Sequence, residues 1–156
     1  MGYTHYYKLN KAGQDFTEEC FNDIEKVLDR YKDILKVDAF CKDSLCINGI
    51  GDEEYEDFYI EDEDDKSFTK TAYKNYDLPV CEILLLLKYH YGDNFDLSSD
   101  GLYICAGETV EDIEENWKIA LKNIKEYFGY NFDLNIAKEK SDFSDMYYYY
   151  VEIKRQ

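Results

Sequence analysis

The sequence predicts a single α+β domain, in which a mixed and mostly antiparallel sheet is covered mainly on one face by about three helices. Segments with apolar residues at every second position, typical of strands, follow one another along the chain with segments of helical spacing. The length of 156 residues suits one domain, and no linker or change of composition divides the chain. We therefore expect residues 1–156 to fold as one unit.

In the N-terminal half, Tyr3 to Leu9 alternates between two faces and predicts a strand. Apolar residues then recur at helical spacing from Phe21 to Leu35, and Thr17 is placed to cap the helix that they predict. Two short apolar segments that follow are typical of a hairpin, and one more strand is expected inside an acidic segment. These three strands are expected at residues 37–41, 45–50 and 58–60.

In the C-terminal half, Pro79 suits the first turn of a helix over residues 80–91, which Gly92 would end. Residues 94–101 are rich in turn-forming types, and Gly101 is expected to adopt a positive φ. Thr109 is expected to cap a third helix whose apolar stripe ends at Gly129. Further strands are expected at residues 102–105, 132–136 and 147–153.

The formal net charge of −17, from 35 acidic and 18 basic residues, limits the partners of this chain. Such a charge repels polyanions, so we expect neither nonspecific nucleic-acid binding nor binding to a membrane. The most apolar run, Ile83 to Leu87, is too short to cross a bilayer. Five cysteines and no leader pattern predict a cytoplasmic protein without disulfides. The aromatic content of 17% favours a small homo-oligomer.

Standard catalytic and metal-binding motifs are missing from the sequence, which has no phosphate-binding loop, nucleophile elbow or paired Cys-x-x-Cys. The only histidines are His5 and His90, and Cys41 and Cys46 have no second pair, so neither a metal nor a cofactor is expected. The acidic segment from Asp52 to Asp65 lacks the spacing of a calcium loop and is expected to be mostly solvated. These observations favour a protein that is not an enzyme.

Three polar segments stand out against this background, because neither core nor turn formation demands them. They carry Met-Gly-Tyr-Thr-His-Tyr at 1–6, Lys-Thr-Ala at 70–72 with Tyr-Asp-Leu at 76–78, and Ser-Ser-Asp-Gly at 98–101. On these motifs the chain resembles a family of short uncharacterised proteins of bacteriophages and mobile elements. The family pattern has Cys and Pro where this chain has Thr69 and Asn75. The resemblance implies a viral setting, hence the cytoplasm of a host cell, and no particular activity.

The same segments supply the candidate ligand-binding residues. Lys70 would neutralise a phosphate, Thr71 and Ser98 would donate hydroxyl groups, and tyrosine rings would stack on a base. If residues 66–72 form a strand, Lys70 and Thr71 point to opposite faces and cannot both line one pocket. Asp77 is also placed to cap the second helix. The full candidate set is Tyr3, His5, Tyr6, Lys70, Thr71, Tyr76, Asp77, Ser98, Ser99 and Asp100.

Three functions remain open on the sequence alone. The preferred one is a phage-type accessory protein that binds and sequesters a small nucleotide-derived ligand and so counters host defence signalling. The second is an acidic inhibitor that binds a basic host protein through the carboxylates of residues 52–65. The third is a small hydrolase acting on a nucleotide, with His5 as general base and Lys70 stabilising developing charge.

Overall fold

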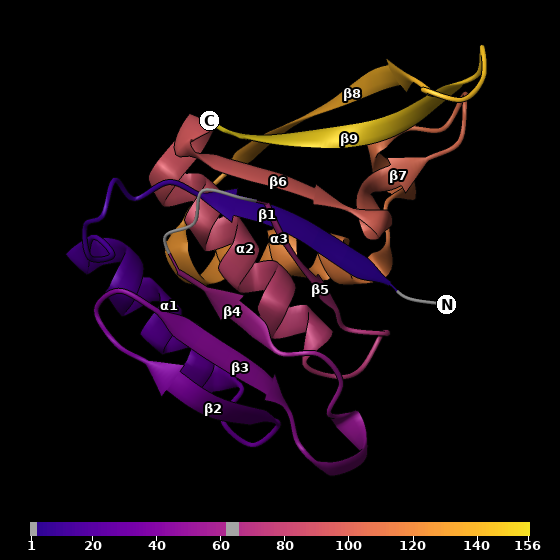
Figure 1. The fold of residues 1–156 in the computed structure, drawn as a ribbon. Helices are drawn as coiled ribbons and strands as arrows, with labels where there is room; N and C mark the ends of the chain where they lie inside the picture. Colours follow the sequence, from indigo (N-terminus) through magenta and orange to yellow (C-terminus); the bar gives the residue numbers. More distant parts are fainter. Residues whose placement is uncertain (1–2, 62–65) are drawn as a thin grey trace.

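A computed structural model describes residues 3–61 and 66–156 of the chain. Within them the predicted α+β class is confirmed, with three α-helices and three small antiparallel sheets (Figure 1). The helices are α1 (Glu18–Arg30), α2 (Asp77–Tyr91) and α3 (Glu115–Phe128). The strands are β1 (Thr4–Leu9), β2 (Leu35–Phe40), β3 (Leu45–Gly49), β4 (Phe58–Ile60), β5 (Ser67–Lys70), β6 (Phe95–Ser99), β7 (Tyr103–Ile104), β8 (Phe132–Lys140) and β9 (Tyr147–Arg155).

The three sheets each contain three strands, in the orders β5-β1-β6, β2-β3-β4 and β7-β9-β8. Every strand pair is antiparallel, and β1 is the central strand of the sheet that carries most of the candidate residues. The expected sheet is therefore divided into three parts. A division of this kind follows from the short strands, because most span only two to six residues.

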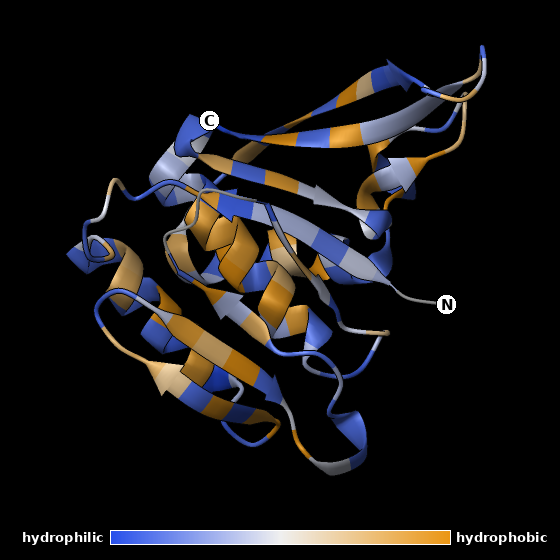
Figure 2. Ribbon diagram, in the orientation of Figure 1, coloured by the Kyte–Doolittle hydropathy of each residue, from blue (hydrophilic) through white to orange (hydrophobic). Residues whose placement is uncertain are grey.

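Helix α2 lies at the centre of the molecule, and its ribbon is apolar on every side along most of its length (Figure 2). Its side chains are buried from Pro79 to Leu87 without a break. A helix that is apolar all round must be covered on all sides, and α2 packs against α1, α3, β6 and β9. One continuous hydrophobic core surrounds it and contains the indole of Trp117.

Several local predictions are confirmed where a side chain controls the end of a helix. The Thr17 hydroxyl accepts a hydrogen bond from the Cys20 backbone amide at the start of α1. Pro79 lies in the first turn of α2, where a missing N–H costs nothing. Gly92 and Gly129 end α2 and α3 with positive φ angles of 54° and 74°.

Two predictions about the third helix and the segment before it are wrong. Thr109 caps a short 3-10 turn over Val110–Asp112, with a complete capping box, whereas α3 begins at Glu115. Ile113 separates them because its backbone is extended, with ψ at 163°. Residues 94–101 contain strand β6, whose pairing with β1 outweighs the turn-forming side chains. Gly101 has no positive φ and is required for a different reason, given below.

A buried carboxylate joins the three helices. Glu82 on α2 accepts hydrogen bonds from Arg30 at 2.8 Å, from the Tyr31 hydroxyl, and from Asn123 on α3 at 3.1 Å. The Arg30 guanidinium also lies 3.8 Å from the centre of the Tyr127 ring. These partners saturate a carboxylate that has no exposed surface, so the cluster orients the helices, and Arg30 Nη1 beside it is buried without a hydrogen-bond partner.

Candidate functional site

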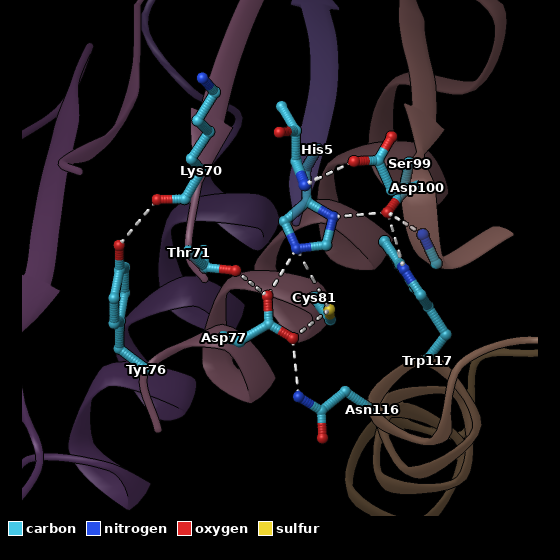
Figure 3. A network of polar contacts seen from close by, with 12 residues as sticks. His5, Lys70, Thr71, Tyr76, Asp77, Cys81, Ser99, Asp100, Asn116 and Trp117 are labelled. Atoms are coloured by element: carbon cyan, nitrogen blue, oxygen red, sulfur yellow. Dashed lines mark hydrogen bonds and ion pairs between the residues drawn. The ribbon is translucent and has the colours of Figure 1, made fainter. Parts of the chain in front are cut away.

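A polar network lies beneath strand β1, where β1 and β6 meet the starts of α2 and α3 (Figure 3). Its members, called here the His5 network, share hydrogen bonds or sulfur contacts in one connected set. They are His5, Thr71, Asp77, Cys81, Ser99, Asn116 and Trp117. All except Asn116 have an exposed fraction of 0%. The network is therefore closed to solvent.

His5 uses both of its ring nitrogens. Its Nε2 lies 2.6 Å from Asp77 Oδ1, and its Nδ1 lies 2.7 Å from Ser99 Oγ. Ser99 Oγ also accepts hydrogen bonds from Trp117 Nε1 and from the Gly101 backbone amide, both at 3.1 Å. These two donors occupy the lone pairs of the oxygen, so the Ser99 proton points toward Nδ1 in a neutral His5 ring. The Nε2 proton is then donated to Asp77.

Asp77 is held as a carboxylate by several donors. Besides His5, its Oδ1 accepts from the Thr71 hydroxyl at 2.5 Å and its Oδ2 accepts from Asn116 at 2.7 Å. Burial by itself would raise the pKa of Asp77, but the hydrogen bonds from His5, Thr71 and Asn116 and the nearby imidazole together lower it. Cys81, one turn further along α2, has its pKa raised, first by burial and then by the charge of Asp77. The network thus contains an ionised carboxylate beside a protonated thiol.

The sequence brings these groups together through strand register and helix spacing. In β1, His5 lies opposite Thr69 of β5 and Ser99 of β6, so the central strand presents them on one face. Thr71 follows Thr69 by two residues and lies on the same side. Asp77 is the first residue of α2, but Tyr76 is its N-cap residue, so Asp77 does not cap the helix as the sequence allowed.

The ten candidate residues divide between the two faces of this sheet. Tyr3, His5, Thr71, Asp77 and Ser99 lie on the buried face. Tyr6 and Ser98 are register partners on the opposite face, and Lys70 pairs with Thr4 and points away from the network (Figure 3). The single pocket expected from the motifs therefore does not form, because alternate residues of a strand point in opposite directions. Contact of any of these residues with a ligand stays a prediction.

Tyr76 and Asp100 have structural contacts instead. The Tyr76 hydroxyl donates to the Glu56 carbonyl oxygen at 2.6 Å, and Asp100 Oδ2 accepts from the Thr4 backbone amide at 3.0 Å. Gly101 follows Asp100 at a place where no larger residue fits. A Cβ atom there would lie 2.2 Å from the Tyr3 hydroxyl and 2.7 Å from Trp117 Cδ1. Close packing explains this glycine, where the sequence suggested a turn.

Sequence reasoning missed Cys81, Asn116 and Trp117, which it treated as ordinary core or helix residues. Nothing in the sequence around Asn116 and Trp117 indicates a polar role. The spacing of Asp77 and Cys81 did carry a signal, since residues four apart on a helix share one face. Among the described residues, His5, Asp77 and Cys81 form one of two groups able to offer three metal ligands, and Asp38, Cys46 and Asp57 form the other.

A groove on the opposite side of the β1 sheet, between β6 and β9, is open to solvent. It has a volume of about 440 Å³ and is called here the β6–β9 groove. Three lysines, three tyrosines and Ser98 are among its lining residues, together with three carboxylates. Lys88 donates to two backbone carbonyls in its wall, and burial lowers the pKa of this amine. The lysines are Lys66, Lys88 and Lys154, and the tyrosines are Tyr103, Tyr148 and Tyr150.

The acidic segment is more structured than the sequence suggested. Glu53, Glu56 and Asp57 accept hydrogen bonds from Asn75, Lys70 and Asn48 respectively, at 2.8 to 3.0 Å. These carboxylates hold neighbouring backbone and side-chain amides in place. Residues 62–65 of the same segment, like Met1 and Gly2 of the opening motif, lie outside the described residues.

Comparison with known proteins finds no family model, no curated protein and no solved structure that matches this chain. The resemblance to phage and mobile-element proteins is therefore carried by the quoted motifs alone. Among the helices in the described part of the chain, none has the length and apolar character needed to cross a membrane.

Proposed function

We propose that this protein binds a small nucleotide-like ligand in the β6–β9 groove. The observation that carries the proposal is the meeting of three lysines and three tyrosines around one cavity, in a chain whose net charge is −17. The groove also holds Asp96, Glu139 and Glu152, so its formal charge is close to neutral. It departs from the strongly acidic character of the chain, so an anionic ligand would be repelled less there than at the acidic parts of the surface.

The groove offers each chemical group that a nucleotide needs. Its volume of about 440 Å³ falls within the usual range for small-molecule sites. The Tyr103 ring meets those of Tyr148 and Tyr150 edge-on, with centroids 5.7 and 6.1 Å apart, and a base would stack on a ring face that these contacts leave open. Lys154 would pair with a phosphate, and Glu152 would accept hydrogen bonds from ribose hydroxyls.

The location of His5 supports binding without turnover. A general base must reach the proton that it removes, and His5 is fully buried with both ring nitrogens in hydrogen bonds. The described lining of the β6–β9 groove contains neither histidine nor cysteine. A protein of this kind would act by occupancy, and in the phage setting implied by the resemblance it would sequester a nucleotide signal of host defence.

Native mass spectrometry of the purified chain with a panel of linear and cyclic nucleotides tests this proposal. We expect one nucleotide class to be retained and then released chemically unchanged. Lys154→Gln should weaken its binding about tenfold or more, because a charged hydrogen bond is lost. Lys122→Gln, on the exposed side of α3, is the matched control and should bind normally. Retention of no nucleotide by the unmodified chain would overturn the proposal.

A second candidate, binding to a basic protein, is favoured by the tip of the β8–β9 hairpin. Phe143 and Met146 there are 98% and 73% exposed, and Asp142 and Asp145 lie beside them. An exposed apolar tip with carboxylates suits a partner that has an apolar pocket with a basic rim. Phe143→Ser should abolish co-purification of such a partner and leave nucleotide retention unchanged, which separates the two functions.

A further inference from the structure

We propose that His5, Asp77 and Cys81 form a binding site for a divalent transition-metal ion, with zinc as the best chemical match. Imidazole nitrogen, carboxylate oxygen and thiolate sulfur are the three ligand types that zinc takes from proteins. One atom from each of these side chains lies within 4.8 Å of the other two. The proposal is independent of the β6–β9 groove, which lies on the other side of the β1 sheet.

The three atoms are close to the positions that a tetrahedral ion requires. At usual zinc distances, neighbouring nitrogen and oxygen ligands lie about 3.3 Å apart and a sulfur lies about 3.6 Å from either. Cys81 Sγ is 3.8 Å from His5 Nε2 and 3.7 Å from Asp77 Oδ2, the carboxylate oxygen that does not contact His5. His5 Nε2 and Asp77 Oδ1, at 2.6 Å, must separate by about 0.7 Å to admit the ion.

The surrounding residues would orient these ligands as metal sites require. Asp77 and Cys81 project from one face of α2, four residues apart, and His5 faces them from the central strand β1. Ser99 holds the far nitrogen of His5, while Thr71 and Asn116 hold Asp77. Hydrogen bonds of this second layer fix ring orientation and ligand basicity in known metal proteins.

An unpartnered hydroxyl beside the network is a second, independent sign of a missing cation. The Tyr3 hydroxyl is buried and has no hydrogen-bond partner, although its side chain is only 2% exposed. Its ring meets the His5 ring edge-on at 5.0 Å. A buried oxygen on the ring that contacts His5 is a candidate for the fourth position of a tetrahedral ion, directly or through water.

A strained turn packs one of its side chains against the Tyr3 ring. The Tyr73 ring stacks on the Tyr3 ring at 4.1 Å and is 61% exposed. Ala72 and Tyr73 both have positive φ angles, 51° and 60°, which non-glycine residues adopt only with backbone strain. Asp100 and Glu114 lie near Tyr73, close enough for their charges to raise its pKa after the effect of burial. Their negative charge would draw a cation to this turn.

Binding would release one proton per ion. The thiol of Cys81 loses its proton to solvent when sulfur bonds to the metal. His5 Nε2 must lose its proton before it can bind the metal. The ring stays neutral because it changes tautomer and carries the proton on Nδ1. Nδ1 then donates to Ser99 Oγ, whose own proton turns away, and one of the two donors already on this oxygen, Trp117 Nε1 or the Gly101 amide, must give up its hydrogen bond.

Titration of the full chain with Co²⁺, after removal of bound metal with a chelator, tests the proposal. We expect one ion per chain, a thiolate-to-cobalt charge-transfer band, and release of one proton in weakly buffered solution. Zn²⁺ should displace the cobalt and remove the band. Absence of the band at millimolar Co²⁺ would overturn the proposal.

Matched cysteine variants locate the ion. Cys81→Ser should remove the band, whereas Cys20→Ser, a change at another fully buried cysteine outside the network, should retain it. Cys46→Ser tests the more exposed group formed with Asp38 and Asp57. Loss of the band in Cys46→Ser, or its survival in Cys81→Ser, would place the ion elsewhere and contradict the proposal.

A measurement on the unmodified chain covers the case in which Cys81→Ser does not fold. Nitrogen NMR of the two histidine rings should show a zinc-dependent shift at Nε2 of His5. The ring of His90, whose Nε2 pairs with Asp23 at 2.7 Å, should not change. A shift at His90 alone, or at neither ring, would contradict the assignment.

Discussion

His5 Nε2 lies 2.6 Å from Asp77 Oδ1, although 72 residues separate the two positions in the chain, and neither side chain has exposed surface. The contact joins the central strand β1 to the first residue of α2. Around it, each hydrogen-bonding group of the imidazole and carboxylate has a partner. A buried pair whose hydrogen-bonding groups are all satisfied fixes the orientation of a helix on a sheet, and its loss should lower the free energy of unfolding.

Replacing Asp77 by Asn should destabilise the fold by about 3 kcal/mol, because a buried pair loses its charge and the new amide meets the Asn116 amide donor to donor. Urea unfolding at neutral pH measures this change. Asp52→Asn, at an exposed carboxylate, is the control and should stay within about 0.5 kcal/mol of the original chain. Equal stabilities of the two variants would show that the His5–Asp77 contact contributes little.

Stability should depend on pH through Asp77 in a definite direction. The folded-state pKa of Asp77 lies below its ordinary value of 3.8, so the folded chain binds this proton less readily than the unfolded chain. The stabilising contribution is therefore complete above the unfolded pKa and is lost as the pH falls through the folded pKa. The difference in unfolding free energy between the original chain and Asp77→Asn should be constant above about pH 5 and shrink below about pH 4. A difference that grows on acidification would contradict the direction of the shift.

Tyr3→Phe should leave the free energy of unfolding unchanged or raise it by about 1 kcal/mol. The hydroxyl that it removes is buried without a hydrogen-bond partner, so its desolvation is uncompensated in the folded chain. Thermal unfolding monitored by circular dichroism measures the effect. Tyr76→Phe is the comparison, because it removes a hydroxyl that donates to a backbone oxygen, and it should be destabilising. Destabilisation by Tyr3→Phe of similar size would show that the Tyr3 hydroxyl has a partner in solution.

Gly101→Ala should destabilise the fold by about 2 kcal/mol, because the added Cβ overlaps both the Tyr3 hydroxyl and the Trp117 ring. Combining it with Tyr3→Phe relieves the first overlap and leaves the second, so the double variant should recover part of the loss. A double-mutant cycle by urea unfolding measures this coupling. Additive effects would show that Gly101 and Tyr3 are not in contact.

The elements whose evidence is local were predicted well from the sequence. Alternation in β1, helical spacing in α1 and the glycines after α2 and α3 each reflect interactions within a few residues. Elements that depend on distant partners were predicted poorly. Strand β6 exists because β1 is available to pair with its turn-forming sequence, and α3 begins after Glu114 because Ile113 is extended and buried in the core.

The candidate site was also predicted only in the part that local sequence patterns reveal. The sequence singled out His5, Thr71, Asp77 and Ser99, and the fold does bring them together, but as a closed network. Cys81 was signalled only by its four-residue spacing from Asp77, and Asn116 carries no local signal that separates it from other helix residues. Whether a polar side chain is free for a ligand depends on which distant groups surround it, and composition and spacing do not contain that information.

By itself, the sequence determined the α+β class, the acidic charge and the two faces of each strand, because composition and periodicity are properties of consecutive residues. Only the tertiary structure decided that His5, Asp77 and Cys81 converge. It also decided that the lysines and tyrosines from α2, β7, β9 and the residue before β5 share one groove. These residues converge because α2 packs against the β1 sheet and β9. Burial of apolar surface drives that packing, and it joins segments far apart in the chain, which a pattern of consecutive residues cannot reveal.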